Sequence, residues 1–97
     1  MILALTAPTQ GDGNEERFNT WYDETHIPEL LSVDGITSAR RFKVVHGNLP
    51  QSYAAAYEVE TDDLDKVLGD MMSGMGEFPP EFDQENSANL IAIEITK

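Results

Sequence analysis

The chain has 97 residues, no cysteine, and a formal net charge of −12 from 18 acidic and six basic residues. A chain this short predicts one domain over residues 1–97, because it cannot support two cores, and the lack of cysteine excludes disulfides, thiolate metal sites and a thiol nucleophile. The negative charge argues against nucleic acid and anionic membranes as partners, and no apolar run approaches the roughly 20 residues of a membrane span.

The first half of the chain predicts a strand followed by a helix. Residues 1–7 predict a short strand, which Pro8 ends. The strand lacks the basic region of a signal peptide, so we expect a cytoplasmic protein. Asn14 predicts the N-cap of a helix with apolar residues at helical spacing, which continues to residue 32. Pro28 removes a backbone donor and crowds the Glu24 carbonyl, so the helix is expected to kink or restart at residues 25–27.

The second half predicts two strands, a helix and a last strand. The strands cover residues 36–45 and 52–60, and a hairpin-like connection joins them. Thr61 predicts the cap of a second helix, whose apolar stripe runs to Met72. The loop of residues 74–86 carries glycines and paired prolines, which fit either a pocket lid or a mobile connection. Residues 89–96 predict the closing strand.

The predicted order β-α-β-β-α-β is that of an α+β, ferredoxin-like sandwich. Both helices then cover one face of the sheet, where we expect Tyr53, Tyr57, Ile91, Ile93 and Ile95. The other face is expected to carry apolar, mostly small residues, namely Ile2, Ala4, Ala54, Ala56, Leu90 and Ala92. Such a face is too apolar to leave in water, so a homodimer is expected to cover it. Its small side chains also leave space for a pocket.

Residues 18–31 hold the highest density of chemically useful side chains, including the only Trp and one of two His. The segment from Trp21 to Pro28 reads W-Y-D-E-T-H-I-P, and a strand with Gly35-Ile36 and Arg41-Phe42 follows. Over residues 18–42 these motifs resemble the EthD-like branch of the dimeric α+β barrel superfamily.

The resemblance implies a homodimer in which two four-stranded sheets close into a barrel, with a pocket between sheet and helices in each subunit. Relatives in the superfamily include isomerases, polyketide cyclases, decarboxylases and cofactor-free monooxygenases, and the EthD-like branch is tied to degradation of small organic compounds. The resemblance therefore implies a small organic ligand and no cofactor. Some relatives hold haem, for which His26 would be the candidate ligand.

His26 is the first candidate catalytic residue, because an imidazole titrates close to neutral pH and can move protons in either direction. The alternative is a structural imidazole that hydrogen-bonds the broken helix turn. Asp23 lies three residues earlier, where it can orient His26 as in a catalytic dyad. The competing interpretation pairs Asp23 with Arg40 or Arg41 of the following strand.

Four further residues are candidates for substrate binding: Trp21, Tyr22, Arg41 and Phe42. The aromatic rings can form a pocket wall, although aromatic residues at helical spacing also build hydrophobic cores. The Tyr22 phenol can in addition polarise a carbonyl group of the substrate. Arg41 can hold a carboxylate or enolate, or form a salt bridge within the acidic surface. No metal site is predicted, because only Asp23, Glu24 or Glu29 lie within helical reach of His26.

Two functions of different classes remain open. The first is a cofactor-independent enzyme that performs acid/base chemistry on a small apolar carbonyl or phenolic compound, such as an isomerase, cyclase or decarboxylase. The second is a non-catalytic dimeric binding or accessory protein in the degradation of small compounds. A monooxygenase of the same fold is a third hypothesis. The sequence does not name the substrate.

Overall fold

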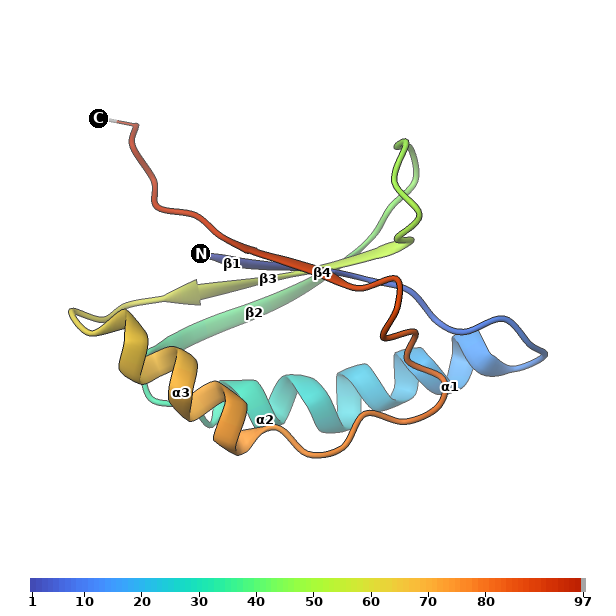
Figure 1. Cartoon of the computed structure of the whole chain (residues 1–97), viewed down its shortest axis with the longest axis horizontal. Helices are drawn as coiled ribbons and strands as arrows, with labels where there is room; N and C mark the ends of the chain where they lie inside the picture. The colour runs from blue at the N-terminus through green and yellow to red at the C-terminus, as the bar shows by residue number, and fades with distance from the viewer. Residues whose placement is uncertain (97) are drawn as a thin grey trace.

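The computed structural model describes residues 1–96 and contains the predicted succession of strands and helices (Figure 1). Its elements are β1 (Ile2–Thr6), α1 (Asn14–Trp21), η1 (Tyr22–His26), α2 (Ile27–Leu31), β2 (Ile36–Lys43), β3 (Tyr53–Val59), α3 (Leu64–Gly74) and β4 (Ala88–Ile91). The α+β class is thus confirmed.

The four strands form one antiparallel sheet in the order β2-β3-β1-β4. The strand β3 lies between β1 and β2, which is the split arrangement of the ferredoxin-like fold. All helices cover one face of this sheet, and the other face is open (Figure 1). The predicted sandwich is therefore confirmed, and its two layers enclose the space between the sheet and the helices.

The disturbance expected from Pro28 takes the form of a π turn. Three segments, α1, η1 and α2, form one continuous helical run, and Ile27 N–H donates to the Tyr22 carbonyl five residues earlier. Pro28 has no N–H to donate to Glu24, so the backbone ahead of it is free to adopt the wider turn. Tyr22 and His26 are the two buried residues of this turn.

Both predicted helix caps need correction. The first helix is capped by Gly13, with φ of 77°, and the Asn14 side chain instead donates to the loop before it. The cap of α3 is Asp63, whose carboxylate accepts from the Lys66 N–H. Thr61 stabilises the turn ahead of that helix by accepting from the Asp63 N–H.

The predicted faces of β1 are reversed. Ile2 lies opposite Tyr57, and Ala4 opposite Ala55, so Ile2 and Ala4 face the helices and are buried. The open face instead carries Leu3 and Leu5 of this strand. The sequence could not decide which face of β1 is buried, because residues 2–5 are all apolar and either alternate set could face the helices.

The last strand is shorter than predicted, because β4 ends at Ile91. The last pair of the β1–β4 ladder is Ile2 with Ile91, and the Ala92 N–H donates to the Met1 carbonyl just beyond it. Ile93 and Ile95 do not pack under the helices, and they are 81% and 88% exposed. The chain after β4 rises on the open side of the sheet, as does the β2–β3 connection (Figure 1).

The core between the two layers is rich in aromatic rings. Its largest fully buried side chains are those of Phe18, Tyr22 and Tyr57. Within residues 1–96, no helix has both the length and the apolar character needed to cross a membrane.

Gly35 at the start of β2 is expected to be intolerant of a side chain. Its φ is +99°, and an added Cβ would lie 2.7 Å from a methyl carbon of Val67 on α3. We expect Gly35→Ala to lower the free energy of unfolding by about 1–3 kcal/mol. Gly69→Ala is the matched control, because Gly69 is exposed within α3 and its added Cβ meets no atom within 4 Å. That variant should gain about 0.5–1 kcal/mol. Urea unfolding measures both, and equal effects would contradict the prediction.

Candidate functional site

A cavity of about 510 Å³ lies between the sheet and the helices. Its lining comes from β1, β3 and β4 on one side and from the helices and the segment after α3 on the other. Most of the lining is apolar, and one wall consists of the methionines Met71, Met72 and Met75. Unbranched methionine side chains adapt to ligands of irregular shape. Such a volume and lining fit a small, mostly apolar molecule.

The sheet side of the cavity holds a buried group of hydroxyls. Tyr22 and Tyr57 meet with their hydroxyl oxygens 3.3 Å apart, and Thr6 lines the cavity beside them. Burial raises the pKa of both phenols, although Arg41 opposes the rise. Both tyrosines therefore stay neutral at physiological pH. The Thr6 Oγ1 atom is buried and has no hydrogen-bond partner among residues 1–96. The group can thus offer hydrogen bonds to a ligand oxygen.

His26 lines the same cavity and is only 5% exposed. Its ring stacks on Trp21 with centroids 4.7 Å apart, contacts Tyr22 edge-on at 4.9 Å, and lies 5.4 Å from Phe78. Burial lowers the His26 pKa, and the nearby Glu29 carboxylate opposes this shift. The imidazole is therefore neutral at pH 7, so one ring nitrogen can accept a proton while the other carries one.

Glu29 is the carboxylate nearest to the imidazole of His26, and it lies beside the Nδ1 atom of that ring. The Glu29 Oε1 atom lies 3.7 Å from Nδ1, and Oε2 accepts from the Gly76 N–H at 2.9 Å. The Nδ1 atom is buried without a hydrogen-bond partner in the described chain. From the sequence, Glu29 was expected only as a possible metal ligand, although its position three residues after His26 already indicated that the two side chains are neighbours.

Asp23 and Arg41 form an ion pair at the edge of the site. Arg41 donates from Nη1 to Asp23 Oδ1 at 2.9 Å and from Nη2 to Asn19 Oδ1 at 2.8 Å. The guanidinium lies 4.2 Å from the Tyr22 ring centroid. Arg41 thus supports the wall from behind and does not line the cavity. No hydrogen bond or ion pair joins Asp23 to His26 among residues 1–96, so Asp23 follows the alternative pairing that the sequence left open.

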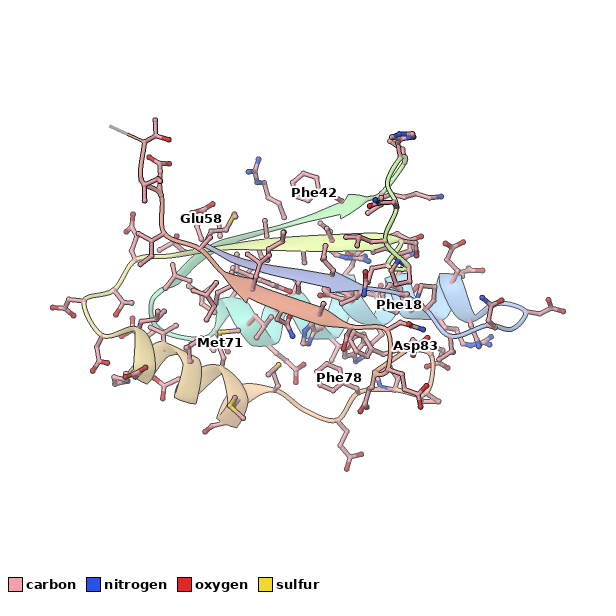
Figure 2. The ribbon with its side chains drawn as sticks, turned by 45° about the horizontal axis from the view of Figure 1, so that its top comes forward. Phe18, Phe42, Glu58, Met71, Phe78 and Asp83 are labelled. Carbon is pink, nitrogen blue, oxygen red and sulfur yellow. The ribbon has the colours of Figure 1, made fainter. Side chains whose placement is uncertain are left out.

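Phe42 requires a correction as a residue of the pocket wall. It is 46% exposed on the open face of the sheet, where the Arg40 guanidinium lies 5.7 Å from its ring centroid. Figure 2 shows Phe42 on one side of the sheet and Phe18, Met71 and Phe78 on the other. The physical reason is the strand alternation, which places Phe42 and Arg41 on opposite faces of β2.

Residues 2–86 match the sequence profile of a family described as "Domain of unknown function (DUF4286)". The chain belongs to this family. No curated protein matches the chain in sequence.

One solved structure shares the fold of this DUF4286 chain: an "ethyl tert-butyl ether d (EthD) family protein" from Bacillus halodurans C-125. The match covers 97% of each chain with a TM-score of 0.56 and 17% sequence identity. The resemblance noted from residues 18–42 is thereby confirmed at the level of the fold.

Of the predicted site residues in this DUF4286 chain, His26 and Tyr22 line the cavity and Trp21 stacks behind His26. Thr6 was not predicted as a site residue, and Tyr57 was expected on the helix-facing side of the sheet without a role in the site. Both face the helices and line the cavity, but from different positions along neighbouring strands, because Thr6 lies opposite Tyr53 and Tyr57 lies opposite Ile2. Within residues 1–96, no three His, Asp or Glu side chains gather in a way that would hold a metal ion.

Proposed function

We propose that the protein is a small-molecule enzyme of the EthD-like type that binds an uncharged carbonyl or phenolic compound and moves a proton on it. One observation carries the proposal: His26, Tyr22, Tyr57 and Thr6 line a single, mostly apolar cavity. The imidazole serves as general acid and base, and the hydroxyls hold the ligand oxygen. The chemistry needs no cofactor, and a cytoplasmic location is part of the proposal.

The absence of charge from the lining supports an uncharged ligand. Among residues 1–96, no Lys, Arg, Asp or Glu lines the cavity. A carboxylate in this space would be desolvated without a cation beside it, at a cost of several kcal/mol. The net charge of −12 would also repel it. Arg41, which the sequence suggested as an anion clamp, is already engaged by Asp23 and Asn19.

We also propose that the protein is a homodimer through the open face of the sheet. Leu3, Leu5 and Leu90 lie on this face beside Ala54 and Ala56, and the exposed Ile93 and Ile95 extend from its edge. A contiguous apolar surface of this kind is typical of an interface. The same residues on a second copy would cover it by two-fold symmetry.

The ligand class can be tested with a pair of probes of similar shape. The neutral phenol 2-naphthol is expected to bind with quenching of its fluorescence, whereas 2-naphthoate, which carries a carboxylate, should bind at least about tenfold more weakly, because one unpaired buried charge costs more than 1.4 kcal/mol. Ala4→Leu, which fills the cavity from β1, should abolish binding of 2-naphthol. Equal binding of both probes would contradict an uncharged ligand.

Proton transfer is tested with 2-tetralone, a neutral ketone of comparable shape. In D₂O, the protein is expected to speed exchange of the α-protons on the order of a hundredfold over buffer, as general acid/base catalysis allows. His26→Gln should return the rate to that of buffer while 2-naphthol still binds. A protein that binds 2-naphthol without speeding exchange would instead fit a binding or accessory protein. The packing of His26, which stacks on Trp21 and lies tilted against Phe78, is the observation that favours this second candidate.

A further inference from the structure

Glu29 contacts two different parts of the site with its two carboxylate oxygens. Oε1 lies 3.7 Å from His26 Nδ1, and Oε2 accepts from the Gly76 N–H at 2.9 Å. The first contact lies within one helical run, whereas the second crosses to the segment after α3. Met75 and Phe78, on either side of Gly76 in sequence, line the cavity. One side chain thus connects the imidazole to the segment that forms the far wall.

The surroundings of His26 leave Glu29 as its nearest acidic group. From the helical run, Trp21 and Tyr22 contact the ring, and both are uncharged. The segment after α3 contributes Phe78, which is also uncharged. From the sheet, the cation that influences the imidazole is Arg41, and it opposes protonation. Glu29 is the group that favours protonation.

A carboxylate beside Nδ1 has a defined chemical consequence. It favours the tautomer with hydrogen on Nδ1, as it does for histidines held by carboxylates in other sites. The Nε2 atom is then the nitrogen left to accept a proton from a ligand in the cavity. Because Nδ1 is buried without a partner among residues 1–96, the 3.7 Å gap has only to shorten slightly for a hydrogen bond to form.

The geometry points to Glu29 as the positioning residue of this site: it sets the tautomer of His26 and fastens the Gly76 segment over the cavity. The first role rests on the proposed function, because it matters when His26 transfers a proton. The second role is a property of the free protein. An added Cβ at Gly76 would lie only 2.9 Å from Glu29 Oε2, so a residue with a side chain at this position would crowd the carboxylate.

Two substitutions separate the roles. Glu29→Gln removes the charge and keeps an oxygen for the Gly76 N–H, whereas Glu29→Ala removes both. In ¹⁵N NMR of the histidine ring, we expect both variants to lower the His26 pKa further and to reduce the Nδ1–H tautomer, because the Glu29 carboxylate favours protonation. Hydrogen exchange at the Gly76 amide should accelerate about tenfold in Glu29→Ala and stay close to wild type in Glu29→Gln.

Glu24→Gln is the matched control, because it removes an exposed carboxylate from the same helical run. It should leave both readouts unchanged. If Asp23→Asn shifts the His26 titration and Glu29→Gln does not, Glu29 is not the positioning residue. Unchanged exchange at Gly76 in Glu29→Ala overturns the fastening role. These measurements use the protein without a probe, so their outcome is independent of whether 2-naphthol binds.

Discussion

Leu5→Asp is expected to convert the proposed homodimer into a monomer. Leu5 lies on the open face of β1, opposite Ala54 of β3 and Ala88 of β4, so no cation stands directly across from it on either neighbouring strand. In the dimer, an aspartate here would be buried from both copies, and each unpaired charge would cost several kcal/mol. In the monomer, the same carboxylate reaches water.

Gel filtration with light scattering measures this change. The wild-type protein should elute at twice the 10.8 kDa of one chain, and Leu5→Asp at the mass of one chain. Thr20→Asp, which adds the same charge at an exposed position of α1, should remain dimeric. Circular dichroism checks that Leu5→Asp remains folded. A wild-type monomer, or a dimer that survives Leu5→Asp, contradicts the proposed interface.

Phe18→Ala is expected to cause the largest loss of stability within one chain. Phe18 is fully buried, with ring centroids of Tyr53, Tyr22 and Phe82 at 5.4, 5.6 and 6.0 Å. The Arg41 guanidinium lies 5.6 Å from the same ring. Truncation removes the contacts of a whole ring and leaves a cavity between the layers, at a cost of about 3–5 kcal/mol in the free energy of unfolding.

Denaturant unfolding followed by Trp21 fluorescence measures this loss. Leu49→Ala is the control, because Leu49 is 61% exposed in the β2–β3 connection, and its effect should stay within about 0.5 kcal/mol. If Phe18→Ala does not fold, Phe18→Leu provides a smaller step of about 1 kcal/mol. A loss below 1 kcal/mol for Phe18→Ala would contradict the central position of this ring.

Much of the fold could be predicted from local patterns. Helical spacing of apolar residues, strand alternation and the positions of Gly and Pro are properties of the chain itself, so the order of strands and helices followed from them. Pro28 likewise predicted an irregular helix at the correct place. Its form as a π turn depended on which carbonyl the Ile27 N–H could reach after the run had packed on the sheet.

The faces of β1 and the end of β4 could not be predicted in the same way. Ile2-Leu3-Ala4-Leu5 is apolar in both phases, so the register against β3 decided which residues face the helices. Ile93 and Ile95 have the alternation of a strand, but a strand needs a neighbour. The pairing of β4 with β1 ends at Ile91 and Ile2, so Ile93 and Ile95 lie beyond this ladder.

In the candidate site, too, some contacts follow from the local sequence and others depend on the tertiary structure. The sequence by itself determined that Tyr22 and His26 lie on one side of a helix, because a helix brings residues four apart together. The stacking of Trp21 on His26, five residues later, goes with the π turn. Only the tertiary structure added Tyr57 and Thr6, paired Asp23 with Arg41, and brought Gly76 to Glu29 across 47 residues of chain. Those contacts depend on strand register and on the packing of two layers, and neither leaves a local pattern in the sequence.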